Sequence, residues 1–194
     1  RVLDEVEDEG IQTVVCTGNI AVGPDPDGVI NLLRDRQVHV VQGDTDRQLA
    51  RLVRNRKRLE RVLDARALAT LQLAHRACSS ANLEWLGGLT HAKTLKIDGE
   101  SIALINGTAS SASTFLKADD ADELFRRQRE ILPARVYLCG GGDEPFMRIV
   151  DGAVFVNPGS CVTPPGDSAR FATVSTEQPI PSVKWRSLPI VSTV

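Results

Sequence analysis

Residues 11–43 read IQTVVCTGNIAVGPDPDGVINLLRDRQVHVVQG, and this stretch decides the fold class. The run at 11–18 is rich in β-branched residues and ends at a glycine, which predicts a strand. Residues 24–37 predict a helix, because prolines stand near its start and apolar residues follow at helical spacing. Residues 38–43 predict a second strand. A strand, helix, strand order favours parallel pairing and an α/β fold.

Further along, the chain changes from parallel connections to hairpins. Residues 94–107 and 146–160 each predict two strands joined by an Asp-Gly turn. Helices are expected at 47–66, 79–89 and 119–132, the last with Asp120 and Glu123 in capping-box positions. A strand is expected at 135–140, and two closing antiparallel strands at 169–175 and 182–188. We expect one domain over 1–194, built as a mixed β-sandwich flanked by helices.

Composition limits the class of protein. The chain has 194 residues, 42% of them hydrophobic, and a net charge of −2, which is ordinary for one globular domain. No apolar run approaches the ~20 residues of a membrane span, and the acidic opening is unlike a signal peptide, so a cytoplasmic protein is expected. In that compartment the cysteines are expected to be unpaired. They are Cys16, Cys78, Cys139 and Cys161.

Residues 136–146, VYLCGGGDEPF, place three glycines directly after a predicted buried strand. Two explanations are open: a phosphate-binding loop, or a site from which larger side chains have been removed. A phosphate loop would continue into a helix with Gly-Lys-Ser or Gly-Lys-Thr. Here Asp143 and Glu144 follow, and their carboxylates would repel an anion.

In their order, the loops of this chain resemble those of bacterial single-domain calcineurin-like metallophosphoesterases. That family follows G-D-x-x-G-x-G-P-D-P with G-N-H-D, H-G, G-H-x-H-x-P-F and N-P-G-S. This chain has GNIAVGPDP at 18–26, GDTD at 43–46, NG at 106–107, GGGDEPF at 140–146 and NPGS at 157–160. The resemblance covers about 180 residues and implies the calcineurin-like fold, with two divalent metals roughly 3.5–4 Å apart.

The same resemblance implies that the metal site is degenerate. Asn19 stands where the family has its bridging aspartate, Asp44 where it has an asparagine ligand, and Thr45 where it has a histidine. The other metal positions are Asn106, Gly141 and Asp143, where the family has histidines. Asp46 and Asn157 would support the ligands from behind. The family's D-x-H motif would lie before Arg1, so we expect this chain to lack the first N-terminal strand of the domain.

The expected function is therefore a non-catalytic binding or scaffold role, with an unknown protein partner or a second copy of the chain. The alternative is a divergent phosphoesterase that hydrolyses phosphomonoesters or phosphodiesters on one hard cation. A cluster of Asn19, Asp44, Asn106 and Asp143 offers only oxygen ligands. Such a cluster suits one Mg²⁺ or Ca²⁺ and disfavours a manganese, zinc or iron pair. Ser160 as a nucleophile is disfavoured, because no G-x-S-x-G elbow surrounds it.

A further alternative is phosphate binding by the predicted helix at 47–66. It carries eight basic side chains against Glu60 and Asp64, a local charge of +6. Candidate contacts to a nucleic acid or nucleotide are Arg47, Arg51, Arg54, Lys57 and Arg58. The competing explanation, which the sequence favours, is a solvated helix face, with the acidic side chains within residues 4–9 as its expected counter-charge.

Overall fold

The structure is a computed structural model that describes residues 1–21, 23–161 and 168–190. Its centre is a five-stranded mixed sheet of order β3-β4-β5-β7-β6. The strands are β3 (Ala92–Ile97), β4 (Glu100–Asn106), β5 (Val136–Gly140), β6 (Phe146–Val150) and β7 (Ala153–Asn157). Strands β4, β5 and β7 pair in parallel, and an antiparallel hairpin closes each edge.

The two Asp-Gly turns are confirmed. Asp98 and Gly99 have φ of 51° and 81°, and Asp151 and Gly152 have φ of 48° and 78°. Two successive residues with positive φ are the feature of the type I′ turns that join tightly twisted hairpins. These turns fix the register of β3 on β4 and of β6 on β7, and the register decides which side chains of the two strands share a face of the sheet.

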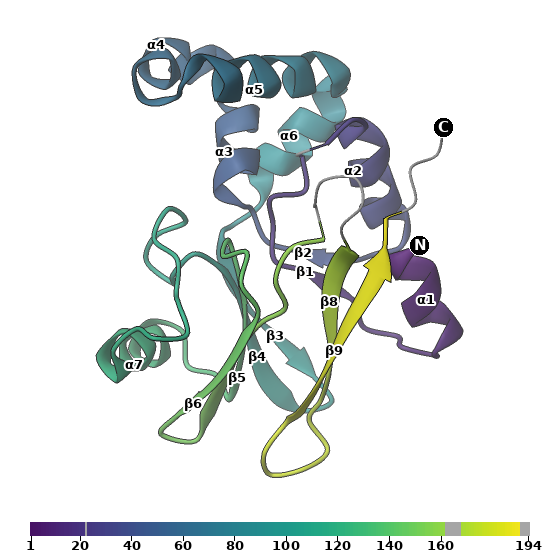
Figure 1. Ribbon diagram of the computed structural model, residues 1–194, viewed down its shortest axis with the longest axis vertical. Helices are drawn as coiled ribbons and strands as arrows, with labels where there is room; N and C mark the ends of the chain where they lie inside the picture. Colours follow the sequence, from purple (N-terminus) through teal and green to yellow (C-terminus); the bar gives the residue numbers. More distant parts are fainter. Residues whose placement is uncertain (22, 162–167, 191–194) are drawn as a thin grey trace.

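Two short ribbons lie on one face of this sheet and α7 (Asp122–Ile131) lies on the other (Figure 1). The ribbons are β1 (Val15–Cys16) with β2 (His39–Val40), parallel, and β8 (Ser168–Ser175) with β9 (Ser182–Pro189), antiparallel. Val15 and Val174 pack on the cluster that includes Ile102 and Leu104. On the opposite face, Phe125 of α7 packs in a cluster with residues of β4, β5 and β7. The expected mixed sandwich flanked by helices is confirmed.

The remaining helices pack in a second apolar cluster together with residues of β1 and β2. They are α1 (Val2–Asp8), α2 (Pro26–Asp35), α3 (Asp44–Ala50), α4 (Leu52–Val62), α5 (Ala65–Ala77) and α6 (Ser80–Gly88). Fully buried Ile30, Leu49 and Leu86 come from α2, α3 and α6. Ser79 caps α6 through a hydrogen bond from Asn82 N, so the helix expected at 79–89 is confirmed.

Several predicted elements differ from those in the structure. The single helix expected at 47–66 is wrong: the chain bends at Arg51 and again at Leu63 and Asp64, where Asp64 caps α5. These bends bring leucines of α3, α4 and α5 into one cluster, which a straight helix would not do. The capping box at Asp120 is also wrong, because Asp120 Oδ2 accepts from Lys117 N instead. The strands expected at 11–18 and 38–43 pair over two residues each.

The acidic helix α1 does not supply the counter-charge of α3 and α4, so that part of the expectation is wrong, while the basic side chains of α4 are exposed as a solvated helix face requires. Its carboxylates pair with Arg36 and Arg186. All four cysteines are unpaired, as expected. Burial raises the pKa of the Cys16 and Cys139 thiols to about 12. In the described part of the chain, no helix has both the length and the apolar character that crossing a bilayer requires.

Candidate functional site

The loops that follow β1, β2, β4 and β5 meet at the C-terminal ends of these strands. Gly18, with φ of 93°, approaches Gly43 so closely that a Cβ on Gly18 would lie 2.5 Å from Gly43 N. A Cβ on Gly140 would lie 2.5 Å from the carbonyl oxygen of Thr17. Gly107 N donates to Gly140 O at 3.0 Å. Glycine at these positions lets four loops from both layers come together.

Asp46 fastens the first two loops to each other. Its side chain is fully buried and accepts hydrogen bonds from three backbone N–H groups: Asn19 at 2.8 Å, Gly43 at 2.9 Å and Ala21 at 3.0 Å. Burial raises the pKa of Asp46, and these amide donors oppose the rise. Asn19 itself has φ of 60°, a left-handed conformation that asparagine tolerates. Asp46 therefore holds the loop after β1 against the start of α3.

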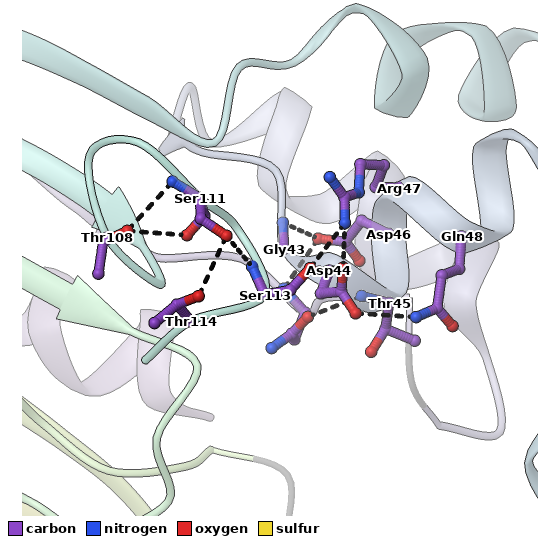
Figure 2. A network of polar contacts seen from close by, with 11 residues as sticks. Gly43, Asp44, Thr45, Asp46, Arg47, Gln48, Thr108, Ser111, Ser113 and Thr114 are labelled. Atoms are coloured by element: carbon purple, nitrogen blue, oxygen red, sulfur yellow. Dashed lines mark hydrogen bonds and ion pairs between the residues drawn. The ribbon is translucent and has the colours of Figure 1, made fainter. Parts of the chain in front are cut away.

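Asp44 is held by three side chains of its own protein (Figure 2). Arg47 Nη2 donates to Asp44 Oδ1 at 2.5 Å, and Ser113 Oγ donates to the same oxygen at 3.0 Å. Gln48 Nε2 donates to Asp44 Oδ2 at 2.8 Å. Arg47 also donates to Ser113 Oγ at 2.9 Å, so the guanidinium, hydroxyl and carboxylate form a closed triangle. Arg47 is thus engaged by side chains of its own protein, and its part in a phosphate-binding surface stays a prediction.

The two asparagines at matched positions have different surroundings. Asn19 Oδ1 accepts from Thr45 N at 3.1 Å, which caps the start of α3. Asn106 is fully buried, and its Nδ2 donates to Thr17 O at 2.6 Å. Asn106 Oδ1 is buried and has no hydrogen-bond partner among the described residues. A buried amide oxygen without a donor is costly, so this atom marks a place where a donor or a cation would be favoured.

The glycine triplet is covered by a side chain from another loop. Gly141 has φ of 97°, and a Cβ placed on it would overlap the ring of Phe115. Asn157 lies behind the triplet: its Nδ2 donates to Gly142 O at 3.2 Å, and its Oδ1 accepts from Gly159 N at 2.9 Å. Asp143 is exposed, and its carboxylate has no hydrogen bond or ion pair within the described part of the chain.

Sequence reasoning missed Ser113 and Phe115, which both come from the loop after β4. This loop is folded on itself by Ser111: Ser111 N donates to Thr108 O at 3.2 Å, and Thr108 N donates back to Ser111 O at 2.8 Å. Nothing in the pattern SSASTF distinguishes these residues from an ordinary polar loop. Only the folded chain places Ser113 beside Asp44 and Phe115 over Gly141.

The two-metal site that the resemblance implies does not fit these residues. Asp44 already has an internal cation, Asn19 Oδ1 is used by a backbone N–H, and the place of a side chain at 141 is taken by the Phe115 ring. Within residues 1–21, 23–161 and 168–190, no three His, Cys, Asp or Glu side chains are grouped to hold a metal ion. Two adjacent dications require several anionic and imidazole ligands, and this donor set does not supply them.

Comparison with known proteins agrees with the fold. A hypothetical protein from Pyrococcus horikoshii OT3 is similar with a TM-score of 0.82 and 21% identity, over 98% of this chain and 81% of that chain. A metallophosphoesterase from Sphaerobacter thermophilus is similar with a TM-score of 0.68 and 15% identity, over 96% and 82%. Vps29 from Entamoeba histolytica, solved in complex with zinc, has a TM-score of 0.53 and 20% identity, over 96% and 87%. These low identities establish the fold alone.

No curated protein matches the chain. The model of the calcineurin-like phosphoesterase superfamily domain matches residues 1–179, which is most of the sequence. This match and the arrangement of the loops around a mixed sandwich lead to one assignment. The chain belongs to the calcineurin-like phosphoesterase superfamily.

Proposed function

We propose that this chain is a non-catalytic member of the superfamily, a pseudoenzyme that uses the fold as a binding or assembly module. The observation that carries the proposal is the ion pair of Asp44 with Arg47, which places a fixed guanidinium beside the carboxylate at a matched metal position. A metal ion at Asp44 would be repelled by this guanidinium. The partner expected for such a module is another protein or a second copy of the chain.

Two further positions support the proposal. Asn19 is neutral where the family has a carboxylate between its metals, and a neutral amide does not offset the repulsion between two dications. Phe115 fills the space next to Gly141 with an aromatic ring, which offers no ligand. Each position therefore replaces a ligand by an internal contact. The fold itself does not select an activity, because its neighbours include both a metallophosphoesterase and Vps29.

Hydrolysis of bis-p-nitrophenyl phosphate and of a mononucleotide, with Mn²⁺, Mg²⁺ or Ni²⁺ added, tests this proposal. We expect the wild type and Asp44→Ala to give the same rate as buffer with each metal. Turnover by the wild type that disappears in Asp44→Ala would overturn the proposal. Asp98→Ala, in the β3–β4 turn, is a matched control for the removal of one carboxylate far from the four loops.

The second candidate is a phosphoesterase that uses a single hard cation, and one atom favours it. Asn106 Oδ1 is buried without a hydrogen-bond partner in the described residues, and an amide oxygen is a ligand that Mg²⁺ or Ca²⁺ accepts. Asn19, Asp44 and Asp143 would be the other ligands of this candidate. A bound cation would polarise a phosphoryl oxygen.

Binding measurements separate the two candidates. Titration calorimetry with Mg²⁺ and Ca²⁺ should show one site in the wild type if the second candidate is correct. The affinity of that site for the cation should fall at least about tenfold in Asp143→Ala and in Asn106→Leu, since each variant loses a ligand. If the wild type and both variants give equal, weak heats, the single-cation candidate is wrong and the non-catalytic proposal stands.

A further inference from the structure

The outward face of α4 carries four cations in one stripe. Leu52 and Leu59 point into the helical cluster and are buried. The exposed residues on the opposite side are Arg54, Lys57, Arg58 and Arg61, which we call the basic face. At about 100° per residue, these four positions fall within an arc of about 100° centred opposite Leu52. The charges are therefore presented together on one surface.

No acidic side chain neutralises the basic face in the described part of the chain. None of its four side chains forms an ion pair or a hydrogen bond there. Glu60 is engaged by Arg56 at 2.8 Å, and Asp64 Oδ1 caps α5 by accepting from Ala67 N at 2.8 Å. The acidic helix α1, which would otherwise be the natural source of counter-charge, pairs with Arg36 and Arg186 and lies on another side of the molecule (Figure 1).

We propose that the basic face binds the phosphate backbone of duplex nucleic acid without sequence specificity. Four adjacent cations suit a dense row of anions, and a duplex presents one negative charge per about 1.7 Å of its axis. Helices α3, α4 and α5 contain no Phe, Tyr or Trp, so bases of a single strand would find no stacking platform. The affinity must then come from phosphates, which favours the partner with the highest charge density.

An anionic membrane fits this surface less well. A helix that lies in a bilayer interface needs an apolar face free to enter the lipid. The apolar face of α4, with Leu52 and Leu59, is buried against the protein. The exposed Val53 and Val62 are nine positions apart, which puts them on opposite flanks of the helix at about 100° per residue. They form no common apolar stripe beside the cations.

Fluorescence anisotropy with a labelled duplex of about 20 base pairs tests the proposal, because four phosphate contacts predict a steep salt dependence. The expected slope of log K against log salt concentration is about −3.6, so binding should weaken roughly 100-fold between about 50 and 200 mM salt. The test variant changes all four residues of the basic face to Gln and should bind at least about tenfold more weakly at the lower salt.

A matched control removes the same amount of charge elsewhere. It changes to Gln four exposed cations on other elements, namely Lys96, Lys117, Arg127 and Lys184, and should bind within about twofold of the wild type. Thermal unfolding followed by circular dichroism checks that both variants fold. The proposal is overturned if the wild type does not bind at low salt, or if the two variants lose affinity equally. Tighter binding to phosphatidylserine vesicles than to the duplex would also overturn it.

Discussion

Arg47 Nη2 lies 2.5 Å from Asp44 Oδ1, so the carboxylate at a matched metal position is paired with a cation that belongs to the chain. Gln48 holds the second oxygen of that carboxylate at 2.8 Å. Both donors lie on α3 with Asp44 and are three and four residues after it, which is the spacing that brings side chains together on a helix. The ion pair therefore joins side chains that the helical sequence DTDRQ places side by side, and Ser113 from the loop after β4 bonds to both of them.

Replacing Arg47 by Met should increase the affinity of the pocket for divalent cations. The change removes one positive charge a few ångströms from any ion at Asp44, which corresponds to about tenfold in affinity for Mn²⁺. Titration calorimetry measures it. Arg56→Met is the control, because it breaks a helical ion pair with Glu60 that lies away from the site. If Arg47→Met binds Mn²⁺ no better than Arg56→Met does, the guanidinium does not control the pocket.

Replacing Gly141 by His should destabilise the fold through two separate effects. The left-handed φ of 97° costs about 1–2 kcal/mol for any side chain, and overlap with the Phe115 ring adds to it. Gly152→His has a similar φ of 78° in open space, so it measures the backbone cost alone. Urea unfolding should show a larger loss for Gly141→His than for Gly152→His.

The contact between Gly141 and Phe115 permits a double-mutant cycle. In the Gly141→His background, Phe115→Ala should recover at least about 1 kcal/mol of unfolding free energy. In the Gly152→His background it should recover none. Additive behaviour at Gly141 and Phe115 would mean that the ring moves aside freely. The space beside Gly141 would then be open to a side chain without cost.

Much of the fold could be predicted because its signals are local. The signals for the Asp98-Gly99 and Asp151-Gly152 turns and for the capped helix at 79–89 each lie within a few residues, and each of these elements was placed correctly. The division of residues 47–66 into helices was missed. The bends between these helices allow Leu49, Leu52 and Leu59 to pack in one cluster. The periodicity of the apolar residues did not reveal them, because a straight helix satisfies it equally well.

The site could be predicted as a set of loops but not as a set of contacts. The resemblance implied that the loops carrying Asn19, Asp44, Asn106 and Gly141 would meet, and those loops do touch. Which side chains fill the space between them depends on the loop after β4. Ser113 and Phe115 reach the site from about 30 to 70 positions away in the sequence, and no local pattern encodes such contacts.

Replacing Asp46 by Asn should cost about 2–4 kcal/mol of unfolding free energy. Three backbone N–H groups point at this buried carboxylate, and in either orientation the amide of Asn would present its own donor to at least one of them. Guanidinium unfolding measures the loss. Asp120→Asn is the control, since its carboxylate accepts one backbone N–H from Lys117 near the surface and should cost under about 1 kcal/mol. Equal losses in the two variants would remove the assigned role of Asp46.

The contact of α2 with α6 should make stability depend on pH through Asp27. Its Oδ1 accepts from Ser79 N at 2.7 Å and from Asn82 Nδ2 at 2.8 Å, and these hydrogen bonds, the backbone one first, hold the pKa of Asp27 below the ordinary 3.8. Because the folded protein holds this proton less tightly than the unfolded chain does, the carboxylate stabilises the fold above pH 3.8, and that contribution is lost as the pH falls through the lowered pKa.

Urea unfolding of Asp27→Asn should therefore show a deficit relative to the wild type that is constant above about pH 5 and shrinks below about pH 4. Asp98→Asn is the control for the loss of an exposed carboxylate, because the Asp98 carboxylate makes no hydrogen bond among the described residues and asparagine also tolerates its φ of 51°. A deficit for Asp27→Asn that stays constant down to about pH 3 would show that the ionised carboxylate does not join these helices. The attachment of α6 would then rest on Asn82 and its contacts with Arg34 and Asn31.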